Sequence, residues 1–486
     1  MSRQAAIIGG GVIGGGWLAR FLLNGWDVAI FDPDPEAERK ISEVLANARR
    51  SLPGLYDAAL PPEGQLRYSR TIEDAVRDAQ WIQESVPERL ELKHDALRKI
   101  QAAASAGAVV GSSTSGFKPS DLGARLQRPG QVLVAHPFNP VYLLPLVEVV
   151  PHAGAEPAFV ERAMETLRSI GMMPLHLRRE IDAHVADRLL ESVWREALWL
   201  VKDDVATTSD IDDAIRFGFG IRWAQMGLFE TYRIAGGEAG MAHFLAQFGP
   251  CLQWPWTRLT DVPDLDATLI GKISSQSDTQ SGARSIRELE RLRDDNLVAM
   301  MRALKGRDWA SGRTHREHDA RLRGRVAAPD WSQPVETAAR TVPVDWTDPD
   351  GHMNEARYCE LFSDAADRLL ELIGCDSGVP ARGGRYVTAE SHLQRLAEAR
   401  LADRVRVTTQ LLASAGDRLH LFSRMHAAGG RLLATAEQLL VHVTLATRRA
   451  SPPAEALQAR LREIQSLHAA LPRPEALYCG RKTPGG

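Results

Sequence analysis

Residues 5–16 read AAIIGGGVIGGG, and residues 27–32 read DVAIFD. The apolar run before the glycines predicts a buried strand, the glycines predict a tight turn, and the residues after them predict the start of a helix. The GxGxxG spacing is met by Gly9, Gly11 and Gly14. Glycines at these places let a backbone approach a pyrophosphate closely, and the helix N-terminus attracts negative charge. The stretch therefore predicts a βαβ unit that binds a dinucleotide.

Asp32 indicates which dinucleotide this would be. It closes the second strand, 18 residues after Gly14. Its carboxylate can accept hydrogen bonds from both ribose hydroxyls and would repel a 2′-phosphate, so NAD is favoured over NADP as the cofactor. Asp34 strengthens this preference. The residues that we expect at the cofactor are Gly9, Gly11, Val12, Ile13, Gly14 and Asp32.

The rest of the chain predicts a multidomain protein. At ~150 residues per domain, 486 residues give room for about three domains. Short apolar runs alternate with amphipathic stretches at first, then three- and four-residue periodicity takes over, and finally one helix is followed by alternating strands. The predicted parts are an α/β Rossmann domain at 1–181, an all-α domain at 182–318, a linker at 319–335, an α+β domain at 336–450, and a C-terminal helix and tail at 451–486. The linker is expected because an Arg-rich segment from Trp309 onward loses helical periodicity and carries prolines.

Composition narrows the classes of function. The 59 basic residues are interspersed with 62 acidic ones for a net charge of −3, so we expect no nucleic-acid partner and no membrane partner. No stretch approaches the ~18 to 20 apolar residues that span a bilayer. The four cysteines lie far apart without CxxC spacing, so we expect reduced thiols in the cytoplasm and no metal site.

The segment 136–150, HPFNPVYLLPLVEVV, supplies a histidine and an acid twelve residues apart, His136 and Glu148. Hydride transfer from an alcohol to NAD needs a base for the hydroxyl proton, and a histidine held by a carboxylate suits that task. Taken alone, a histidine beside proline and phenylalanine is more often structural. Beside a dinucleotide site, it becomes a candidate base.

Several motifs together resemble the 3-hydroxyacyl-CoA dehydrogenase superfamily. GGGVIGGG, ESVPE, SSTSG, HPFNP and LVEV occur in the order and spacing of that family, from residue 4 to about residue 310. The resemblance implies a catalytic histidine, a partner glutamate, a substrate-contacting serine, the asparagine of HxFNP and an acid near the cofactor, at His136, Glu148, Ser115, Asn139 and Glu88.

Two departures from this family point away from an acyl-CoA substrate. Where the family usually has Asn-Arg at the first helix of the second domain, this chain has Asp187-Arg188. Asp187 either faces the pocket or caps and solvates that helix. Between Asp32 and Ile72 there is also no lysine cluster for the CoA phosphates. A small free substrate is therefore expected.

Nine of the 30 aromatic residues fall between Phe217 and Trp256. They form either an aromatic core or a site for a quaternary ammonium, which aromatic faces attract by ~0.5 to 2 kcal/mol per contact. The segment resembles that of L-carnitine dehydrogenases, whose substrate is a 3-hydroxy acid with a trimethylammonium group. On that reading, the residues expected at the substrate are Trp223, Phe229 and Tyr232 around the ammonium, Asp187 adding negative potential, and Arg222 or Ser115 at the carboxylate and hydroxyl ends.

Residues 347–358, TDPDGHMNEARY, precede a helix and four strand-like runs. Taken alone, TDPDG reads as a solvent turn that caps a helix. The whole arrangement is similar to hotdog-fold acyl-CoA thioesterases of the 4-hydroxybenzoyl-CoA type. This likeness implies that the Asp348 carboxylate attacks a thioester or activates water, with backbone N–H groups at the helix N-terminus stabilising the oxyanion. It also implies pocket roles for His352, Asn354 and Glu390.

Together the two resemblances imply NAD-dependent oxidation of L-carnitine to 3-dehydrocarnitine and hydrolysis of betainyl-CoA to glycine betaine and CoA. Betainyl-CoA also carries trimethylammonium, for which Trp346, Tyr358 and Phe362 are candidate contacts. A homodimer or larger homo-oligomer is implied as well. Two alternatives stay open: a dehydrogenase for another 3-hydroxy acid or 3-hydroxyacyl-CoA, and a hotdog domain that binds acyl-CoA or oligomerises without catalysis.

Overall fold

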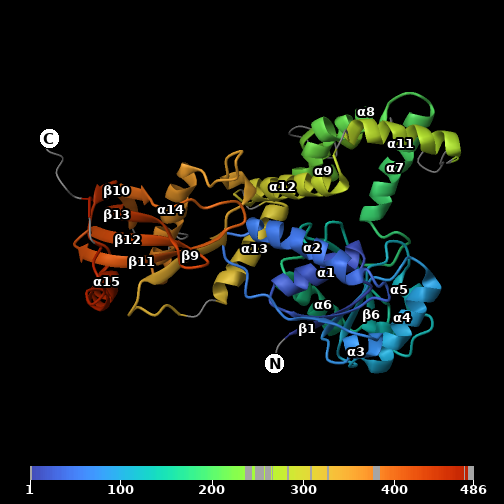
Figure 1. Ribbon diagram of the computed structural model, residues 1–486, viewed down its shortest axis with the longest axis horizontal. Helices are drawn as coiled ribbons and strands as arrows, with labels where there is room; N and C mark the ends of the chain where they lie inside the picture. The colour runs from blue at the N-terminus through green and yellow to red at the C-terminus, as the bar shows by residue number, and fades with distance from the viewer. Residues whose placement is uncertain are drawn as a thin grey trace. The chain divides into compact units, whose positions relative to one another are not determined.

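The computed structural model describes residues 3–235, 244–246, 257, 264, 266–281, 284–306, 309–325, 328–375, 384–474 and 477–479. The chain divides into two compact units, whose elements are drawn in Figure 1. The first unit holds residues 1–49 and 62–318, and the second holds residues 50–61 and 319–486. The predicted multidomain class, with Rossmann, helical and hotdog parts, is confirmed.

An eight-stranded sheet with the order β3-β2-β1-β4-β5-β6-β7-β8 forms the Rossmann part. Its strands are β1 (Gln4–Ile8), β2 (Asp27–Phe31), β3 (Leu66–Tyr68), β4 (Trp81–Glu84), β5 (Val109–Ser112), β6 (Val132–Pro137), β7 (Leu146–Pro151) and β8 (Met173–His176). The first six strands are parallel, whereas β7 runs antiparallel to β6 and β8 runs parallel to β7. Strands β4, β5 and β6 are buried along their whole length, as expected where helices cover both faces of a parallel sheet.

Six α-helices connect these strands. They are α1 (Val12–Leu23), α2 (Ala37–Ser51), α3 (Ile72–Val76), α4 (Leu90–Ala103), α5 (Pro119–Gly123) and α6 (Pro157–Ser169). One apolar cluster joins α3 and α4 to the middle strands through side chains such as Leu97, Ile100 and Val110. Full burial of each such side chain contributes roughly 1.5 to 3 kcal/mol. This core holds the carboxyl ends of the parallel strands at one edge.

The turn between β1 and α1 depends on two glycines. Gly9 has a φ of +100°, which L side chains rarely adopt, and a Cβ there would meet the carbonyl oxygen of Ser85 at 2.5 Å. A Cβ on Gly14 would overlap the carbonyl oxygen of Gly9. Because neither position has room for a side chain, α1 begins directly at the carboxyl end of β1.

The all-α part follows β8. It comprises α7 (Ala186–Lys202), α8 (Thr208–Ala214), the π-helical turn η3 (Ile215–Phe219), α9 (Gly220–Ala235), α11 (Ala267–Ser281), α12 (Ile286–Lys305) and α13 (Ser311–Gly324). Helix α12 begins with a capping box in which the Ser285 hydroxyl accepts the Glu288 N–H and the Glu288 carboxylate accepts the Ser285 N–H. Gly227, with a φ of +69°, kinks α9.

Helix α13 corrects the linker prediction. The Arg-rich segment from Trp309 was expected to lack helical structure, and the predicted linker began at residue 319. The helix instead continues to Gly324. Its buried face consists of His315, His318 and Asp319 with Leu322. These residues have helical spacing, but three of the four are polar, so hydropathy does not reveal the face.

The second unit contains an antiparallel sheet in the order β10-β13-β12-β11-β9, with β14 paired to β13. Its strands are β9 (Val335–Thr341), β10 (Gly384–Arg395), β11 (Arg404–Ala415), β12 (Arg418–Ala427), β13 (Leu432–Thr444) and β14 (Arg449–Ala450). Helix α14 (Glu355–Leu372) lies along the sheet, and α15 (Glu455–His468) contacts β11 (Figure 1). This one long helix on an antiparallel sheet is the predicted hotdog arrangement. The predicted C-terminal helix corresponds to α15.

Residues 50–61, from the last turn of α2 into the segment that leads to β3, pack with the second unit. They include the 3-10 turn η1 (Leu52–Leu55). The Asp319 carboxylate accepts the backbone N–H groups of Asp57 and Ala58 at 2.9 and 3.1 Å. The Asp57 carboxylate lies 2.6 Å from Nη2 of Arg340, a buried residue of β9. The second unit is therefore built from two separate stretches of the chain.

We expect Gly14→Ala to disrupt the first unit, because its Cβ has no space beside the Gly9 carbonyl. Overpacking of this kind costs about 1 to 3 kcal/mol. The matched control is Gly15→Ala, whose Cβ would lie 3.5 Å from Val44 side-chain atoms, an ordinary contact. Thermal unfolding and NADH fluorescence titration should show a lower Tm and at least tenfold weaker binding for Gly14→Ala alone. Equal behaviour of the two variants would contradict the steric argument.

Candidate active sites

The glycine-rich turn and Asp32 lie together at the carboxyl edge of the Rossmann sheet. The Gly10 N–H donates to Oδ2 of Asp32 at 2.5 Å, and the Asp34 N–H donates to Oδ1 at 2.7 Å. No side chain caps the N-terminus of α1, and a Cβ on Gly11 would meet no atom within 4 Å. Space and unused N–H groups therefore coincide at this helix end, which fits a dinucleotide pyrophosphate.

Val12 and Ile13 open helix α1 beside this space, and Val12 is exposed. Asp34, which was expected to reinforce the preference of Asp32 for NAD, instead pairs with Lys40. Its Oδ2 lies 2.6 Å from Nζ of Lys40, and this hydrogen bond lowers the pKa of Asp34. Asp34 is thus already neutralised by a side chain of α2.

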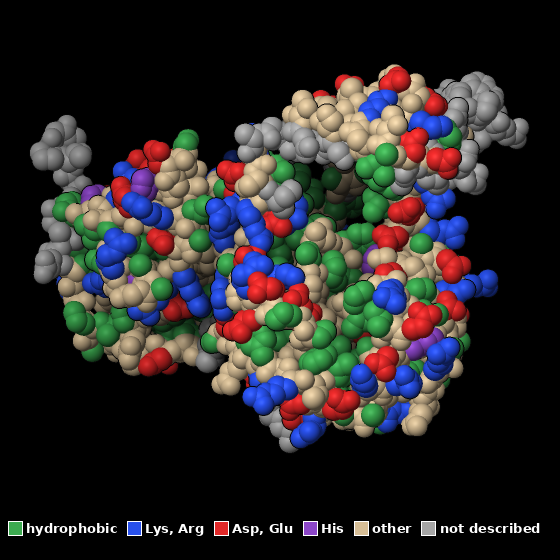
Figure 2. All heavy atoms as spheres, turned by 45° about the vertical axis from the view of Figure 1, so that its right-hand side comes forward, with side chains coloured by type: hydrophobic (Ala, Val, Ile, Leu, Met, Phe, Trp, Pro, Cys, Tyr) green, Lys and Arg blue, Asp and Glu red, His purple; other side chains and the backbone are tan. Residues whose placement is uncertain are grey.

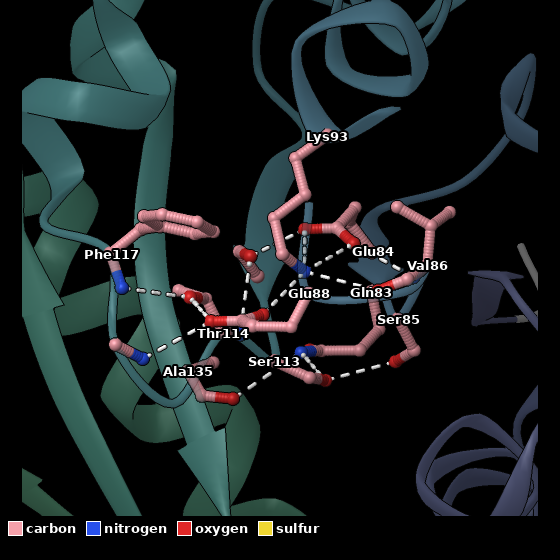
Figure 3. Close-up of polar contacts among 12 residues, drawn as sticks. Gln83, Glu84, Ser85, Val86, Glu88, Lys93, Ser113, Thr114, Phe117 and Ala135 are labelled. Carbon is pink, nitrogen blue, oxygen red and sulfur yellow. Dashed lines mark hydrogen bonds and ion pairs between the residues drawn. The ribbon is translucent and has the colours of Figure 1, made fainter. Parts of the chain in front are cut away.

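A buried lysine, missed in the sequence, joins two glutamates near this edge (Figure 3). Lys93 is 1% exposed, and its Nζ lies 3.0 Å from Oε1 of Glu84 and 3.2 Å from Oε2 of Glu88. Glu84 is fully buried and also accepts the hydroxyl of Ser112. Lys93 lies one turn into α4, beyond the ESVPE motif, where nothing in the sequence separates it from a surface lysine.

Glu88 fixes the loop that carries Ser115. Its Oε1 accepts the hydroxyl of Thr114 at 2.5 Å and the N–H of Gly116 at 3.2 Å (Figure 3). Burial raises the pKa of Glu88, but these hydrogen bonds and Lys93 outweigh it and lower the pKa overall. The carboxylate therefore stays ionised and holds both residues that flank Ser115, whose own side chain is exposed.

His136 and Glu148 form the predicted pair. They face each other across the antiparallel strands β6 and β7, with Nδ1 of His136 3.0 Å from Oε2 of Glu148. The other oxygen, Oε1, accepts the N–H groups of Val185 and Ala186 at the start of α7, both at 2.9 Å. Burial raises the pKa of Glu148, yet the hydrogen bonds from His136 and α7 outweigh it and lower the pKa. An ionised glutamate thus directs Nε2 of His136 outward as the reactive nitrogen.

Asp187 lies on the other side of this imidazole. Its Oδ2 is 3.6 Å from Nε2 of His136. Asp187 therefore faces the reactive nitrogen, which was one of the two roles left open by the sequence. Asn139 follows β6 in an exposed position.

His184 is a second residue that the sequence analysis missed. It is fully buried, has a φ of +50°, and its ring centroid lies 5.6 Å from that of His136. Its Nε2 lies 3.3 Å from the carbonyl oxygen of Thr114. Burial and the neighbouring His136 lower the pKa of His184. His184 is therefore a neutral ring next to the candidate base. It lies just before a predicted helix, where no sequence motif indicates that a histidine is buried.

The aromatic candidates lie on α9, and the described contacts do not join them to one another. Trp223 packs on Phe219 at 4.5 Å between ring centroids, and Tyr232 stacks on Phe244 at 4.6 Å. Phe229 is 74% exposed, and Arg222 is exposed too. The remaining aromatic residues of the segment, within 247–256, lie outside the described residues.

Asp348 sits in a tight turn ahead of α14. Its Oδ1 accepts the N–H groups of Asp350 and His352 at 3.0 and 2.9 Å, and Gly351 turns the chain with a φ of +79°. Within the described chain, Oδ2 makes no hydrogen bond. One oxygen therefore shapes the turn, and the other is open to a reactant.

The three pocket candidates around Asp348 have different neighbours. Nδ1 of His352 is 3.9 Å from Oδ1 of Asp348, and its Nε2 is 3.4 Å from a carboxylate oxygen of Glu398. Asn354 is the N-cap of α14, since its Oδ1 accepts the Ala356 N–H at 3.2 Å. Glu390 lies on β10, in a different part of the sheet.

The three aromatic candidates of this unit are core residues. Trp346, Tyr358 and Phe362 are each buried in one apolar cluster. The guanidinium of Arg340 lies 3.9 Å from the Trp346 ring centroid, and the Tyr358 hydroxyl accepts the Ala399 N–H at 3.0 Å. The expectation of a trimethylammonium contact at these rings is wrong for the chain as described, because their faces are already occupied.

Over the described residues, no His, Cys, Asp and Glu side chains group in a way that could hold a metal ion. In that same part of the chain, every helix is too short or too polar to cross a membrane. On the face drawn in Figure 2, acidic and basic side chains are interspersed, in line with the net charge of −3.

Family models match three parts of the chain. Residues 4–181 match the NAD binding domain of 3-hydroxyacyl-CoA dehydrogenase, and residues 184–259 match the C-terminal domain of that enzyme. Residues 342–461 match the thioesterase-like superfamily.

Several known proteins are similar to this chain. A protein of Ruegeria pomeroyi named L-carnitine dehydrogenase/betainyl-CoA thioesterase is 60% identical over 475 residues, 97% of each chain. A Pseudomonas putida protein named L-carnitine dehydrogenase is 50% identical over 313 residues, 64% of this chain and 96% of that protein. The solved structure of 5-formyl-3-hydroxy-2-methylpyridine 4-carboxylic acid 5-dehydrogenase, an NAD+-dependent dismutase, is 28% identical, with a TM-score of 0.54, over 63% of this chain and 99% of that one.

We expect Lys93→Met to destabilise the first unit. The substitution leaves the buried Glu84 carboxylate without its cation, a loss that costs about 3 to 5 kcal/mol. The double variant Lys93→Met/Glu84→Gln should recover part of this loss, because the remaining buried groups are then neutral. Urea unfolding monitored by NADH binding measures both. An undiminished stability of Lys93→Met would show that the pair contributes nothing.

Proposed function

Because the chain belongs to the family of L-carnitine dehydrogenase/betainyl-CoA thioesterases, we propose that it is a bifunctional enzyme of carnitine catabolism. Its first unit oxidises L-carnitine to 3-dehydrocarnitine with NAD, and its second hydrolyses betainyl-CoA to glycine betaine and CoA. The single observation that carries this proposal is the His136–Glu148 pair beside a dinucleotide-binding edge, in one chain with the Asp348 turn.

In the oxidation, Nε2 of His136 accepts the proton of the C3 hydroxyl. When bound, NAD supplies the acceptor for the hydride that leaves C3. Glu148 stabilises the imidazolium through Nδ1, and its second oxygen, held by the N–H groups of α7, keeps it in place. Ser115 and Asn139, both exposed, hold the hydroxyl and orient the substrate.

For the remaining substrate groups, we propose that Trp223, Phe229 and Tyr232 contact the trimethylammonium and that Arg222 binds the carboxylate. The support is that Phe229 is 74% exposed, that Trp223 and Tyr232 stay partly exposed beside their ring neighbours, and that the Arg222 guanidinium is exposed. Glu88 maintains the cofactor edge through the Ser115 loop.

In the hydrolysis, the thioester C–S bond breaks and CoA leaves as its thiol, while water supplies the second oxygen of the betaine carboxylate, either by direct attack or by opening an acyl anhydride formed with Asp348. Asp348 acts through Oδ2, either as the nucleophile or as the base that activates water. His352 maintains the turn, and Asn354 holds the N-terminus of α14, whose N–H groups stabilise the oxyanion. A pocket role for Glu390 on β10 is part of the same proposal and rests on the family resemblance alone.

We further propose that the protein is a cytoplasmic homodimer or larger homo-oligomer. Two features support self-association: the apolar side chains of Leu189, Leu190 and Trp194 are exposed on α7, and β10 is an edge strand with many exposed positions. Cys359 and Cys479 are free thiols, as suits a reducing compartment. Light scattering of the full chain measures the oligomeric state.

His136→Asn and Asp348→Asn should separate the two activities. Loss of the base lowers NADH formation from L-carnitine by about 10²- to 10⁴-fold and leaves thiol release from betainyl-CoA unchanged. Asp348→Asn does the reverse, whereas the control Asp350→Asn, which alters an exposed acid of the same turn, keeps both activities. If either active-site change abolished both activities in a folded protein, two independent sites would be the wrong description.

A substrate panel tests the dehydrogenase assignment. We expect NADH formation with L-carnitine and little with D-carnitine, 3-hydroxybutyrate or 3-hydroxybutyryl-CoA. Robust turnover of 3-hydroxybutyryl-CoA, with none of carnitine, would overturn the proposal.

A further inference from the structure

The reactive nitrogen of His136 faces the carboxylate of Asp187. Asp187 lies in the first turn of α7, its side chain is 18% exposed, and Oδ2 is 3.6 Å from Nε2 of His136. Among the described residues, no lysine or arginine forms an ion pair with Asp187. The titratable groups around it are His136, His184, Glu148 and Glu191. A largely buried carboxylate without a counter-charge is costly, so a ligand that supplies the positive charge is expected.

His184 adds an electron-rich ring next to His136, with 5.6 Å between the two ring centroids. A carbonyl oxygen can only accept, so Nε2 of His184 must donate its hydrogen to Thr114, and in the neutral ring Nδ1 is then a lone pair. That Nδ1 is buried and has no hydrogen-bond partner. The residue also holds a left-handed backbone conformation, which a β-substituted side chain adopts at a cost. The Asp187 carboxylate and the neutral His184 ring, both next to His136, are therefore electron-rich.

We propose that Asp187 forms the subsite for a quaternary ammonium on the carbon next to the oxidised carbinol, where the neutral ring of His184 next to His136 adds no competing positive charge. This inference rests on the dehydrogenase activity proposed above and deepens it. The carbinol oxygen must come within ~2.6 to 3.2 Å of Nε2 to lose its proton. In a 3-hydroxy-4-ammonio acid, only three bonds separate that oxygen from the nitrogen, so the ammonium lies within reach of Asp187. A quaternary ammonium has positive charge but no N–H to donate, and a carboxylate that lacks a lysine or arginine partner among the described residues matches it.

A purely structural role for Asp187 predicts a different result. An acid in the first turn of a helix stabilises the helix dipole whatever the substrate carries. Such a role would affect folding, or would affect all substrates alike. The subsite instead requires that the loss depends on the charge of the ligand.

The test compares a cation with its neutral carbon isostere. L-Carnitine and 3-hydroxy-5,5-dimethylhexanoate differ in having a trimethylammonium or a tert-butyl group of similar size. For Asp187→Asn in the full chain, we expect kcat/KM for L-carnitine to fall about 100-fold, mainly through KM, and that for the isostere to stay level or rise. The control Glu191→Gln removes the same charge one turn further along α7, from an exposed residue near Arg195, and should change either value less than twofold.

Binding without turnover gives a second readout. The cationic 4-trimethylammoniobutanoate and the neutral 5,5-dimethylhexanoate lack the reacting hydroxyl, and their dissociation constants follow from quenching of bound NADH. Asp187→Asn should weaken only the cation, and Asp187→Glu should restore part of its binding. Unchanged betainyl-CoA hydrolysis in the same sample reports intact protein.

The outcomes separate this inference from the function on which it rests. An equal fall for cation and isostere, or no fall for either, would overturn the subsite while leaving carnitine oxidation in place. A wild-type enzyme that oxidises 3-hydroxybutyryl-CoA and not carnitine would overturn the proposed function itself.

Discussion

The buried carboxylate of Glu148 is the interaction on which the dehydrogenase unit depends. One oxygen holds Nδ1 of His136, and the other accepts two N–H groups at the start of α7. The same side chain thus sets the tautomer of the candidate base and fastens the first helix of the all-α part to the sheet. Because α7 also carries Asp187, the position of that second carboxylate relative to the imidazole follows from the same contact.

The active-site edge contains several acids, of which Glu84 and Glu148 are fully buried, and the chain balances their charge in different ways. Glu84 and Glu88 share the ammonium of Lys93. Glu148 relies on N–H donors and an imidazole. Among the described residues, Asp187 pairs with no lysine or arginine, and the charges that act on it are those of histidines and other acids. In a pocket where the remaining charges are balanced internally, one unbalanced acid decides the sign of the potential that an incoming ligand meets.

The features that the sequence predicted well lie within single short segments. The glycine turn with Asp32, the His136–Glu148 hairpin and the Asp348 turn each bring their groups together through neighbouring strands or one loop. Lys93 and His184 were missed because their burial depends on distant parts of the chain. Helix α13 was misjudged since histidines form its inner face, and the aromatic residues at 346, 358 and 362 were misjudged because a ring looks the same in sequence whether its face is free or covered.

The stretch 50–61 determines how the two units of this chain can be separated. Relatives named only for the dehydrogenase match about 64% of the chain, which suggests a simple appended module. Yet the hotdog unit includes a loop encoded far upstream, whose backbone is held by Asp319 and whose carboxylate meets Arg340. Cutting the chain once near residue 319 would therefore separate residues 50–61 from the rest of the second unit. To transfer the hydrolase domain to another protein, residues 319–486 are therefore not enough. The segment 50–61 has to be included as well.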